Sequence, residues 1–143
     1  MFSTIRVAFA TTDRKQVNQH FGTAASFVIY DIDQDRASLV EVVQFTQIDQ
    51  DGQNDKLSAR IEALTGCVAV YCQAIGASAI NRLLPLGVQP FKLEAGTAIA
   101  HTIGNLQLEL RESPSAWLAR AIEHRQPGRE SRFDLMEAEG WNE

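Results

Sequence analysis

The stretch CVAVYCQAIGASAINRLLPLGVQPF, residues 67–91, predicts a strand, a helix and a second strand in succession. Its beginning, residues 67–71, is apolar and partly β-branched, which indicates a buried strand. A glycine-containing turn at residues 74–76 then leads into a short helix that stops at Pro85. The apolar side of this helix carries Ile80, Leu83 and Leu84. Residues 88–91 form the second strand, and the usual right-handed connection makes the two strands parallel.

Three strands precede this unit along the chain. Residues 4–10 alternate with a period of two, which is typical of a strand. Residues 27–32 and 39–45 are two apolar, β-branched runs separated by the polar residues 33–36, so they predict an antiparallel hairpin. Residues 11–23 are expected to form a loop. The five strands predict a single α/β domain, in which a mixed sheet with the strand order of a ribonuclease H-like fold is flanked by helices.

Three further helices are predicted from apolar residues that recur three or four positions apart. The first spans residues 57–64 and ends at Gly66, and the second spans residues 99–110. The last begins with Ser113 as its cap and Pro114 in its first turn, where the two residue types are favoured.

Length and composition narrow the class of protein. The 143 residues suffice for one domain with its own core, which we expect over residues 1–124. Residues 125–143 are expected to form a mobile tail, because they have few apolar residues and no clear period. With 13 basic and 18 acidic residues the net charge is -5, which argues against nucleic acid or an anionic membrane as the main partner. The chain has no run of about 18 apolar residues and no signal-peptide pattern, so we expect it in the cytoplasm.

The segment VNQHFGTA places His20 in the loop that leaves the carboxyl end of the first strand. Ligands of open α/β sheets favour the crevice at such strand ends. His20 is therefore either a metal ligand held toward that crevice or a residue that hydrogen-bonds its own loop. Arg14 and Lys15 give the loop positive charge, and Gly22 gives its backbone freedom. Phe21 is expected to anchor the loop in the core.

Cys72 follows the strand of residues 67–71 at the same edge of the sheet. Because a helix start follows it, we expect Cys72 in the crevice with a lowered pKa. The helix starts after Gly76 and Gly96 also direct free N–H groups to this side, which suits an anionic ligand. Cys67 comes five residues earlier, on the opposite face of a regular strand, so the two cysteines do not predict a chelating pair. Cys67 is expected to be a small buried residue, and both cysteines are expected to be reduced thiols.

The remaining histidines and acids are weaker candidates. His101 and His124 are both expected at surface positions of helices. A ribonuclease H-like sheet also raises the hypothesis of a metal-dependent nuclease or phosphodiesterase, in which carboxylates on the central strand hold two metal ions. The first strand contains no acid, and the nearest candidates follow it or lie near the hairpin turn: Asp13, Asp31 and Asp33.

A resemblance to a known family extends over most of the chain, about residues 6–124. The segments RVAFATTDRKQVNQHFGTAASFVIYDI and GCVAVYCQAIGASAINRLLPLGVQPFKLEAGTAIAHTI together resemble the nitrogenase iron–molybdenum cofactor-binding family, the group of NifX, NifY, NafY and the C-terminal domain of NifB. The resemblance implies a ribonuclease H-like fold without nuclease activity that binds iron–sulfur precursors of the iron–molybdenum cofactor. It also implies transfer between assembly proteins, from a NifB-like donor to a NifEN-like acceptor.

The family's cluster-linked histidine falls on His20, and Cys72 is expected as a second, softer ligand. The other expected cofactor contacts come from the same loop: Arg14, Lys15, Asn18, Phe21 and Gly22. Imidazole is a suitable ligand for iron, and a single such contact keeps binding reversible. We therefore predict a non-catalytic carrier. A metal-dependent nuclease and a cluster-free regulatory interaction module stay open as alternatives.

Overall fold

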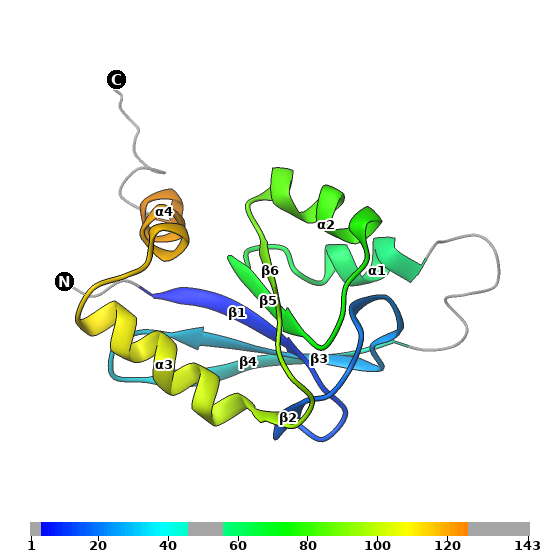
Figure 1. The fold of residues 1–143 in the computed structure, drawn as a ribbon, viewed down its shortest axis with the longest axis horizontal. Coiled ribbons are helices and arrows are strands. Elements are labelled where there is room, and N and C mark those ends of the chain that lie inside the picture. The colour runs from blue at the N-terminus through cyan, green and yellow to red at the C-terminus, as the bar shows by residue number, and fades with distance from the viewer. Residues whose placement is uncertain (1–3, 46–55, 126–143) are drawn as a thin grey trace.

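Five strands form one mixed sheet in the computed structural model, which describes residues 4–45 and 56–125. They are β1 (Ile5–Ala10), β3 (Ser26–Ile32), β4 (Ala37–Gln44), β5 (Ala69–Cys72) and β6 (Gln89–Lys92). The order across the sheet is β4-β3-β1-β5-β6, with β5 and β6 parallel to β1 and with β3 and β4 as an antiparallel hairpin beside it (Figure 1). The predicted five-stranded mixed sheet is confirmed. Its assignment to the ribonuclease H-like folds stays a prediction.

Helices cover both faces of this sheet and make three layers (Figure 1). They are α1 (Lys56–Glu62), α2 (Ala77–Leu83), α3 (Ile99–Arg111) and α4 (Ala116–Arg125). The side chains of β1 alternate between the two cores, as a strand requires. Ile5, Val7 and Phe9 pack with α3 and α4, whereas Ala8 and Ala10 pack with α1 and α2. All five are fully buried, so the middle of the sheet is covered on both sides.

The turn predicted between the two hairpin strands is present. The Asp33 carboxylate accepts hydrogen bonds from the backbone N–H groups of Asp35 at 2.8 Å and Arg36 at 2.6 Å. These donors, the Asp35 N–H first, favour the ionised carboxylate and lower the pKa of Asp33. An aspartate that binds its own following backbone is a common way to close such a turn, which is why the polar run could be read correctly.

The segment of residues 11–23 is more ordered than the predicted loop. It contains β2 (Gln16–Val17), which pairs antiparallel with β7 (Thr97–Ala98), and a short 3-10 helix, η1 (Phe21–Thr23). The Ile99 N–H, at the start of α3, donates to the Lys15 carbonyl at 2.9 Å beside this small sheet. Strands of two residues have no alternation that a sequence could reveal, because their pairing depends on a partner far along the chain.

The last helix starts later than its predicted cap. α4 begins at Ala116, and the Ala119 N–H donates to the Ser115 carbonyl at 2.9 Å, so Ser115 rather than Ser113 occupies the capping position. The Glu109 carboxylate accepts hydrogen bonds from both the N–H and the hydroxyl group of Ser115, at 3.0 and 2.8 Å. This contact with α3 decides between two nearby serines that local preferences do not separate.

The predicted tail lies almost wholly outside the described residues, since α4 runs to Arg125 and the description ends there. Over residues 4–45 and 56–125, every helix is too short or too polar to traverse a lipid bilayer.

Candidate functional site

Three loops meet at one edge of the sheet, because β1, β5 and β6 run parallel and their carboxyl ends point the same way. The loop after β1 turns back toward the sheet, where the Asn18 N–H donates to the Ala10 carbonyl at 3.2 Å. It then runs beside the end of β5, so that His20 forms an isolated parallel bridge with Ala74. The predicted meeting of the His20 loop with the segment after Cys72 is therefore confirmed.

The first part of this loop is closed by Asp13. Its carboxylate accepts the backbone N–H groups of Lys15 at 2.8 Å and Gln16 at 3.0 Å, and the Thr11 hydroxyl donates to it at 3.1 Å. The N–H donors, that of Gln16 first, lower the pKa of Asp13. Arg14 stands at the tip of the turn with φ 64°, the one non-glycine residue of the described chain in the left-handed region.

His20 is held by its backbone and leaves its side chain free. The Gln73 N–H donates to the Gln19 carbonyl at 2.9 Å, and the Phe21 N–H donates to the Ala74 carbonyl at 2.8 Å, so both neighbours of His20 are tied to the segment after β5. The imidazole is exposed, and it makes no hydrogen bond or ion pair within the described part of the chain. The interpretation in which the imidazole hydrogen-bonds its own loop is therefore wrong.

Phe21 anchors the loop, as expected. Its side chain cannot contact a cofactor in this structure, contrary to the other expectation. Its ring is fully buried, with its centroid 5.5 Å from that of Phe27, and it presents no surface to a ligand. Gly22 lies in η1 without a positive φ, and a Cβ there would meet Leu57 at an ordinary 3.7 Å. Gly22 therefore does not adopt a backbone conformation that requires glycine, contrary to our expectation.

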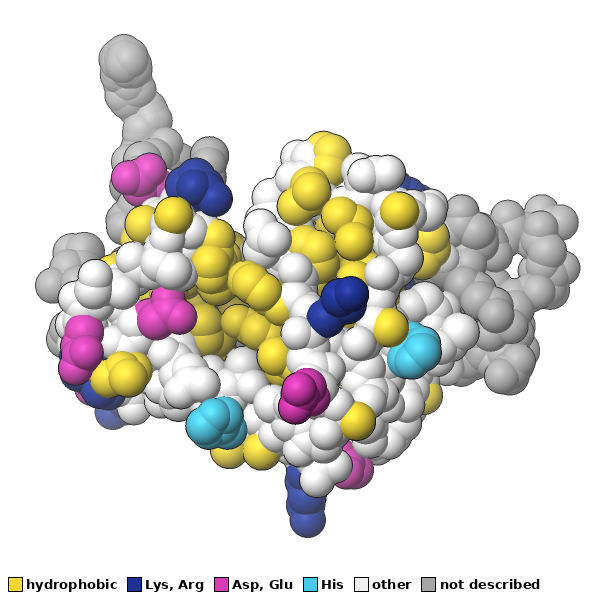
Figure 2. All heavy atoms as spheres, viewed as in Figure 1, with side chains coloured by type: hydrophobic (Ala, Val, Ile, Leu, Met, Phe, Trp, Pro, Cys, Tyr) yellow, Lys and Arg dark blue, Asp and Glu magenta, His cyan; other side chains and the backbone are white. Residues whose placement is uncertain are grey.

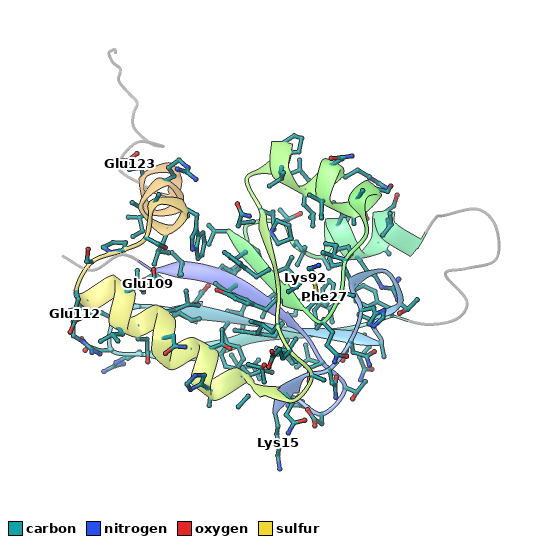
Figure 3. All side chains as sticks on the ribbon, viewed as in Figure 1. Lys15, Phe27, Lys92, Glu109, Glu112 and Glu123 are labelled. Carbon is teal, nitrogen blue, oxygen red and sulfur yellow. The ribbon has the colours of Figure 1, made fainter. Side chains whose placement is uncertain are left out.

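The polar residues predicted to contact a cofactor differ in their surroundings within the loop. Asn18 fastens the loop, because its side-chain oxygen accepts the Thr12 N–H and its amide nitrogen donates to the Thr12 hydroxyl, each at 3.0 Å. Arg14 and Lys15 are exposed at the turn before β2. Figure 3 shows the Lys15 side chain extending away from the body of the domain. Contact of these three side chains with a cofactor stays a prediction.

Cys72 is not in an open crevice. Its side chain is fully buried in the core under α1 and α2, and its thiol lies 3.6 Å from the Phe91 carbonyl. Burial raises the pKa of Cys72 to about 11, so the lowered pKa predicted from the neighbouring helix start is wrong. Loss of solvation outweighs the two interactions that favour the thiolate, the hydrogen bond with the Ala74 backbone and the positive charge of Lys92.

Cys67 is buried, as predicted, and both cysteines are free. The expected opposite facing of the two side chains is wrong, since Cys67 and Cys72 belong to the same core. The strand begins only at Ala69, so alternation cannot be counted back to Cys67. His101 is exposed on α3, as predicted, whereas the side chain of His124 lies outside the described residues. Among the residues that the structure describes, no three or more His, Cys, Asp or Glu side chains form a group that could hold a metal ion.

Lys92 is the residue at this edge that sequence reasoning missed. It is the last residue of β6, it is exposed, and it lies directly opposite Cys72 in the register of β5 and β6. The only sequence signal was its place at the end of a predicted parallel strand, which is where ligand contacts gather.

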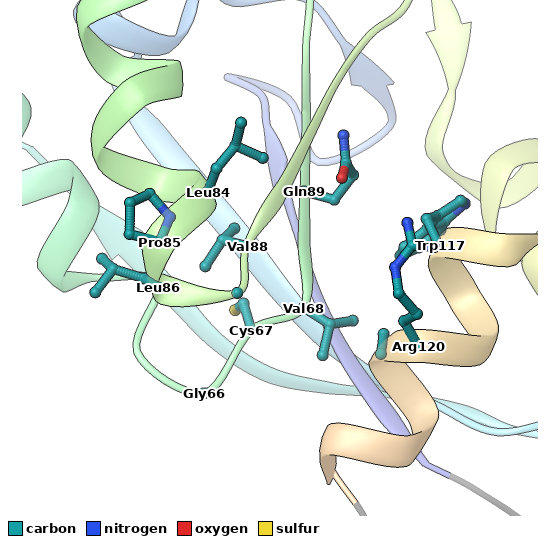
Figure 4. A pocket seen from close by; sticks show the side chains of 12 residues that line it. Gly66, Cys67, Val68, Leu84, Pro85, Leu86, Val88, Gln89, Trp117 and Arg120 are labelled. Carbon is teal, nitrogen blue, oxygen red and sulfur yellow. The ribbon is translucent and has the colours of Figure 1, made fainter.

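A cavity of about 570 Å³ lies at the opposite edge of the sheet, between α4 and the amino ends of β5 and β6 (Figure 4). Apolar side chains occupy the hollow beside α4 in Figure 2. Its polar lining comes from Gln89 and Arg120, and Trp117 forms one wall. This cavity includes none of the predicted site residues. We therefore take the edge of the sheet that carries His20 as the candidate site, because its exposed imidazole can ligate a metal ion.

Comparison with known proteins bears directly on the His20 loop. The model of the dinitrogenase iron-molybdenum cofactor family matches residues 3–108, which include β1, the His20 loop and most of α3. The chain belongs to this family. Its relatives in the family include NifX of Azotobacter vinelandii, which is 52% identical over 97% of this chain and 88% of that protein. The FeMo cofactor biosynthesis protein NifB of Frankia alni is 35% identical over 62% of this chain, which corresponds to 18% of NifB.

A solved structure supports the fold of this family member. The crystal structure of PH0822 has a TM-score of 0.54 to this chain at 28% sequence identity, and the alignment covers 80% of this chain and 98% of that one. The α/β fold of this chain therefore matches nearly the whole length of the domain in that crystal structure.

Proposed function

We propose that this protein is a non-catalytic carrier that binds an iron–sulfur precursor of the iron–molybdenum cofactor in the cytoplasm and passes it between assembly proteins. The observation that carries the proposal is His20, an exposed imidazole on a backbone tied to the neighbouring segment on both sides. Family membership and the likeness to NifX and NifB support the cargo, because the family is named for the iron–molybdenum cofactor and NifB for the biosynthesis of that cofactor.

The chemistry of the site suits a cargo that must leave again. A neutral imidazole donates a nitrogen lone pair to iron, and one such bond gives no chelate effect. The described residues add no group of three metal ligands around it. Cys72 is left out of the proposed ligand set, because its buried thiol would have to lose a proton and leave the core before it could bind iron.

The proposed exchange has two partners with different roles. A NifB-like protein supplies the precursor, and a NifEN-like protein accepts it. His20 then competes with the ligands of each partner for one iron of the cluster, and an exposed side chain lets a partner reach that iron without any unfolding of the carrier.

The experiment is an anaerobic titration of the protein with an isolated iron–sulfur precursor of the iron–molybdenum cofactor, followed by absorption and EPR spectroscopy and by co-elution on gel filtration. Saturable binding at one cluster per chain, and release to an acceptor that lacks its cluster, would support the proposal. Metal-dependent cleavage of nucleic acid without cluster binding would replace it with the nuclease alternative. Binding to assembly proteins without any affinity for the cluster would leave an interaction module.

A further inference from the structure

Lys92 is an exposed cation at the same edge of the sheet as His20. It ends β6, and the Leu93 N–H that follows donates to the Cys72 carbonyl at 2.8 Å, which fixes the backbone where the strand stops. Within the described residues the Lys92 ammonium forms no ion pair. Figure 3 labels Lys92 on the face turned to the viewer, in front of the sheet. A lysine without a carboxylate partner at a ligand-binding edge is available to an anion from outside.

The pairing around β5 sets the distance between Lys92 and His20. His20 forms its bridge with Ala74 on one side of this segment, and Lys92 lies opposite Cys72 on the other. Neighbouring strands are about 4.8 Å apart and successive residues about 3.3 Å, so the two backbones lie about 12 Å from each other. One cluster held between a lysine and a histidine side chain spans a gap of this size.

The charge of Lys92 reaches into this end of the sheet. It is one of the groups that favour the thiolate of Cys72, against the larger effect of burial. Cys72 and Lys92 are paired residues of neighbouring strands, so their side chains leave the sheet on the same face. By contrast, Lys15 extends away from the domain from the turn before β2 (Figure 3).

We propose that Lys92 is the electrostatic contact of the cargo site, so that its ammonium binds an anionic sulfide or carboxylate group of the cluster whose iron His20 ligates. This inference rests on the proposed function and adds the chemical class that the site selects, an anionic cluster rather than a neutral or cationic metal complex. An ammonium contacts an anion as a compact point charge, which requires no fixed orientation of the cargo. Such a contact strengthens binding and still permits release.

The test compares Lys92→Gln, Lys92→Arg and the control Arg36→Gln in anaerobic titrations with an isolated iron–sulfur precursor of the cofactor at two salt concentrations. Arg36 is exposed in the turn between β3 and β4, at the end of the sheet where β1 begins. We expect Lys92→Gln to weaken binding about tenfold, as for loss of a charge-assisted contact. We expect Lys92→Arg to stay within about threefold of the parent, because the charge is kept, and Arg36→Gln to match the parent. The salt dependence of the affinity should shrink in Lys92→Gln alone, and thermal stability should not change in any of the three, since both residues are exposed.

Equal affinity of Lys92→Gln and the parent protein would overturn the inference, as would an equal loss in Arg36→Gln, which would indicate only a general charge effect. His20→Ala separates this result from the fate of the proposed function. If His20→Ala loses cluster binding and Lys92→Gln does not, Lys92 is not a cluster contact and the proposed carrier function stands. If Lys92→Gln loses affinity for the cluster and His20→Ala keeps it, Lys92 contacts the anion and His20 is not an iron ligand.

Discussion

Replacement of His20 by alanine removes the proposed iron ligand and almost nothing else. The imidazole is exposed and makes no hydrogen bond within the described residues, whereas the bonds that hold this loop come from backbone atoms of Gln19, Phe21, Gln73 and Ala74. Alanine keeps all of those bonds. The free energy of unfolding should therefore change by no more than about 0.5 kcal/mol, as for other surface substitutions.

Binding should respond very differently, because the iron–nitrogen bond has no substitute nearby. We expect His20→Ala to weaken cluster affinity at least tenfold, which corresponds to about 1.4 kcal/mol. His101→Ala is the matched control, since His101 is also exposed but lies on α3. Both variants are titrated anaerobically with the isolated iron–sulfur precursor, and both are melted in parallel.

Two results would refute the reasoning about His20. Parent-like affinity in His20→Ala would show that the imidazole is not a ligand. A loss of affinity accompanied by a large drop in melting temperature would show that the residue supports the loop, against the free side chain that the structure describes. An equal loss in His101→Ala would point to nonspecific capture of the cluster by surface histidines.

Three further predictions concern the frame of the site. Phe21→Ala should lower the free energy of unfolding by about 3–5 kcal/mol in denaturant titrations, because the ring is fully buried beside Phe27; a change below about 1 kcal/mol would contradict its role as anchor. Arg14→Gly should raise the melting temperature, since glycine relieves the left-handed strain by up to about 1 kcal/mol net of its own entropy cost, and a lower melting temperature would show that the arginine side chain stabilises the turn. Cys72 should resist alkylation in the native protein at pH 8 and react once the chain is denatured. Because the pKa of Cys72 is raised in the folded state, the free energy of unfolding should be constant with respect to this thiol below its ordinary pKa of 9.0 and should fall by about 2 kcal/mol as pH rises toward 11. Thermal melts of the parent and Cys72→Ala across this pH range would check the prediction.

The parts of the fold that follow from local periodicity could be predicted from the sequence. Alternating residues in β1 and apolar residues three or four apart in α3 gave the right elements, because each pattern directs side chains to a surface that must be buried. The hairpin of β3 and β4 followed from the polar turn around Asp33. The parallel placement of β5 and β6 followed from the chirality of the connection through α2.

The arrangement of the site could be predicted only in part, because it depends on contacts between distant segments. The place of His20 at the carboxyl edge followed from strand order, whereas its bridge to Ala74 required the folded structure. Cys72 was misjudged because a neighbouring helix start suggested an electropositive setting, and the sequence does not show how deeply the strand end is buried. Lys92 was missed because nothing local distinguishes it from other surface lysines until the register of β5 and β6 is known.

The way His20 is mounted accounts for how one ligand can serve a carrier. Binding normally costs entropy when a loop has to be ordered, and that cost is subtracted from the affinity. Here the backbone on both sides of His20 is already tied to Gln73 and Ala74, so the loop need not be ordered when cargo arrives. The imidazole still projects from the surface, and within the described residues no second metal ligand lies in a group with it. Because the backbone is ordered before the cluster binds, affinity is higher without a chelate effect. A partner protein that provides two ligands can therefore remove the cluster from His20.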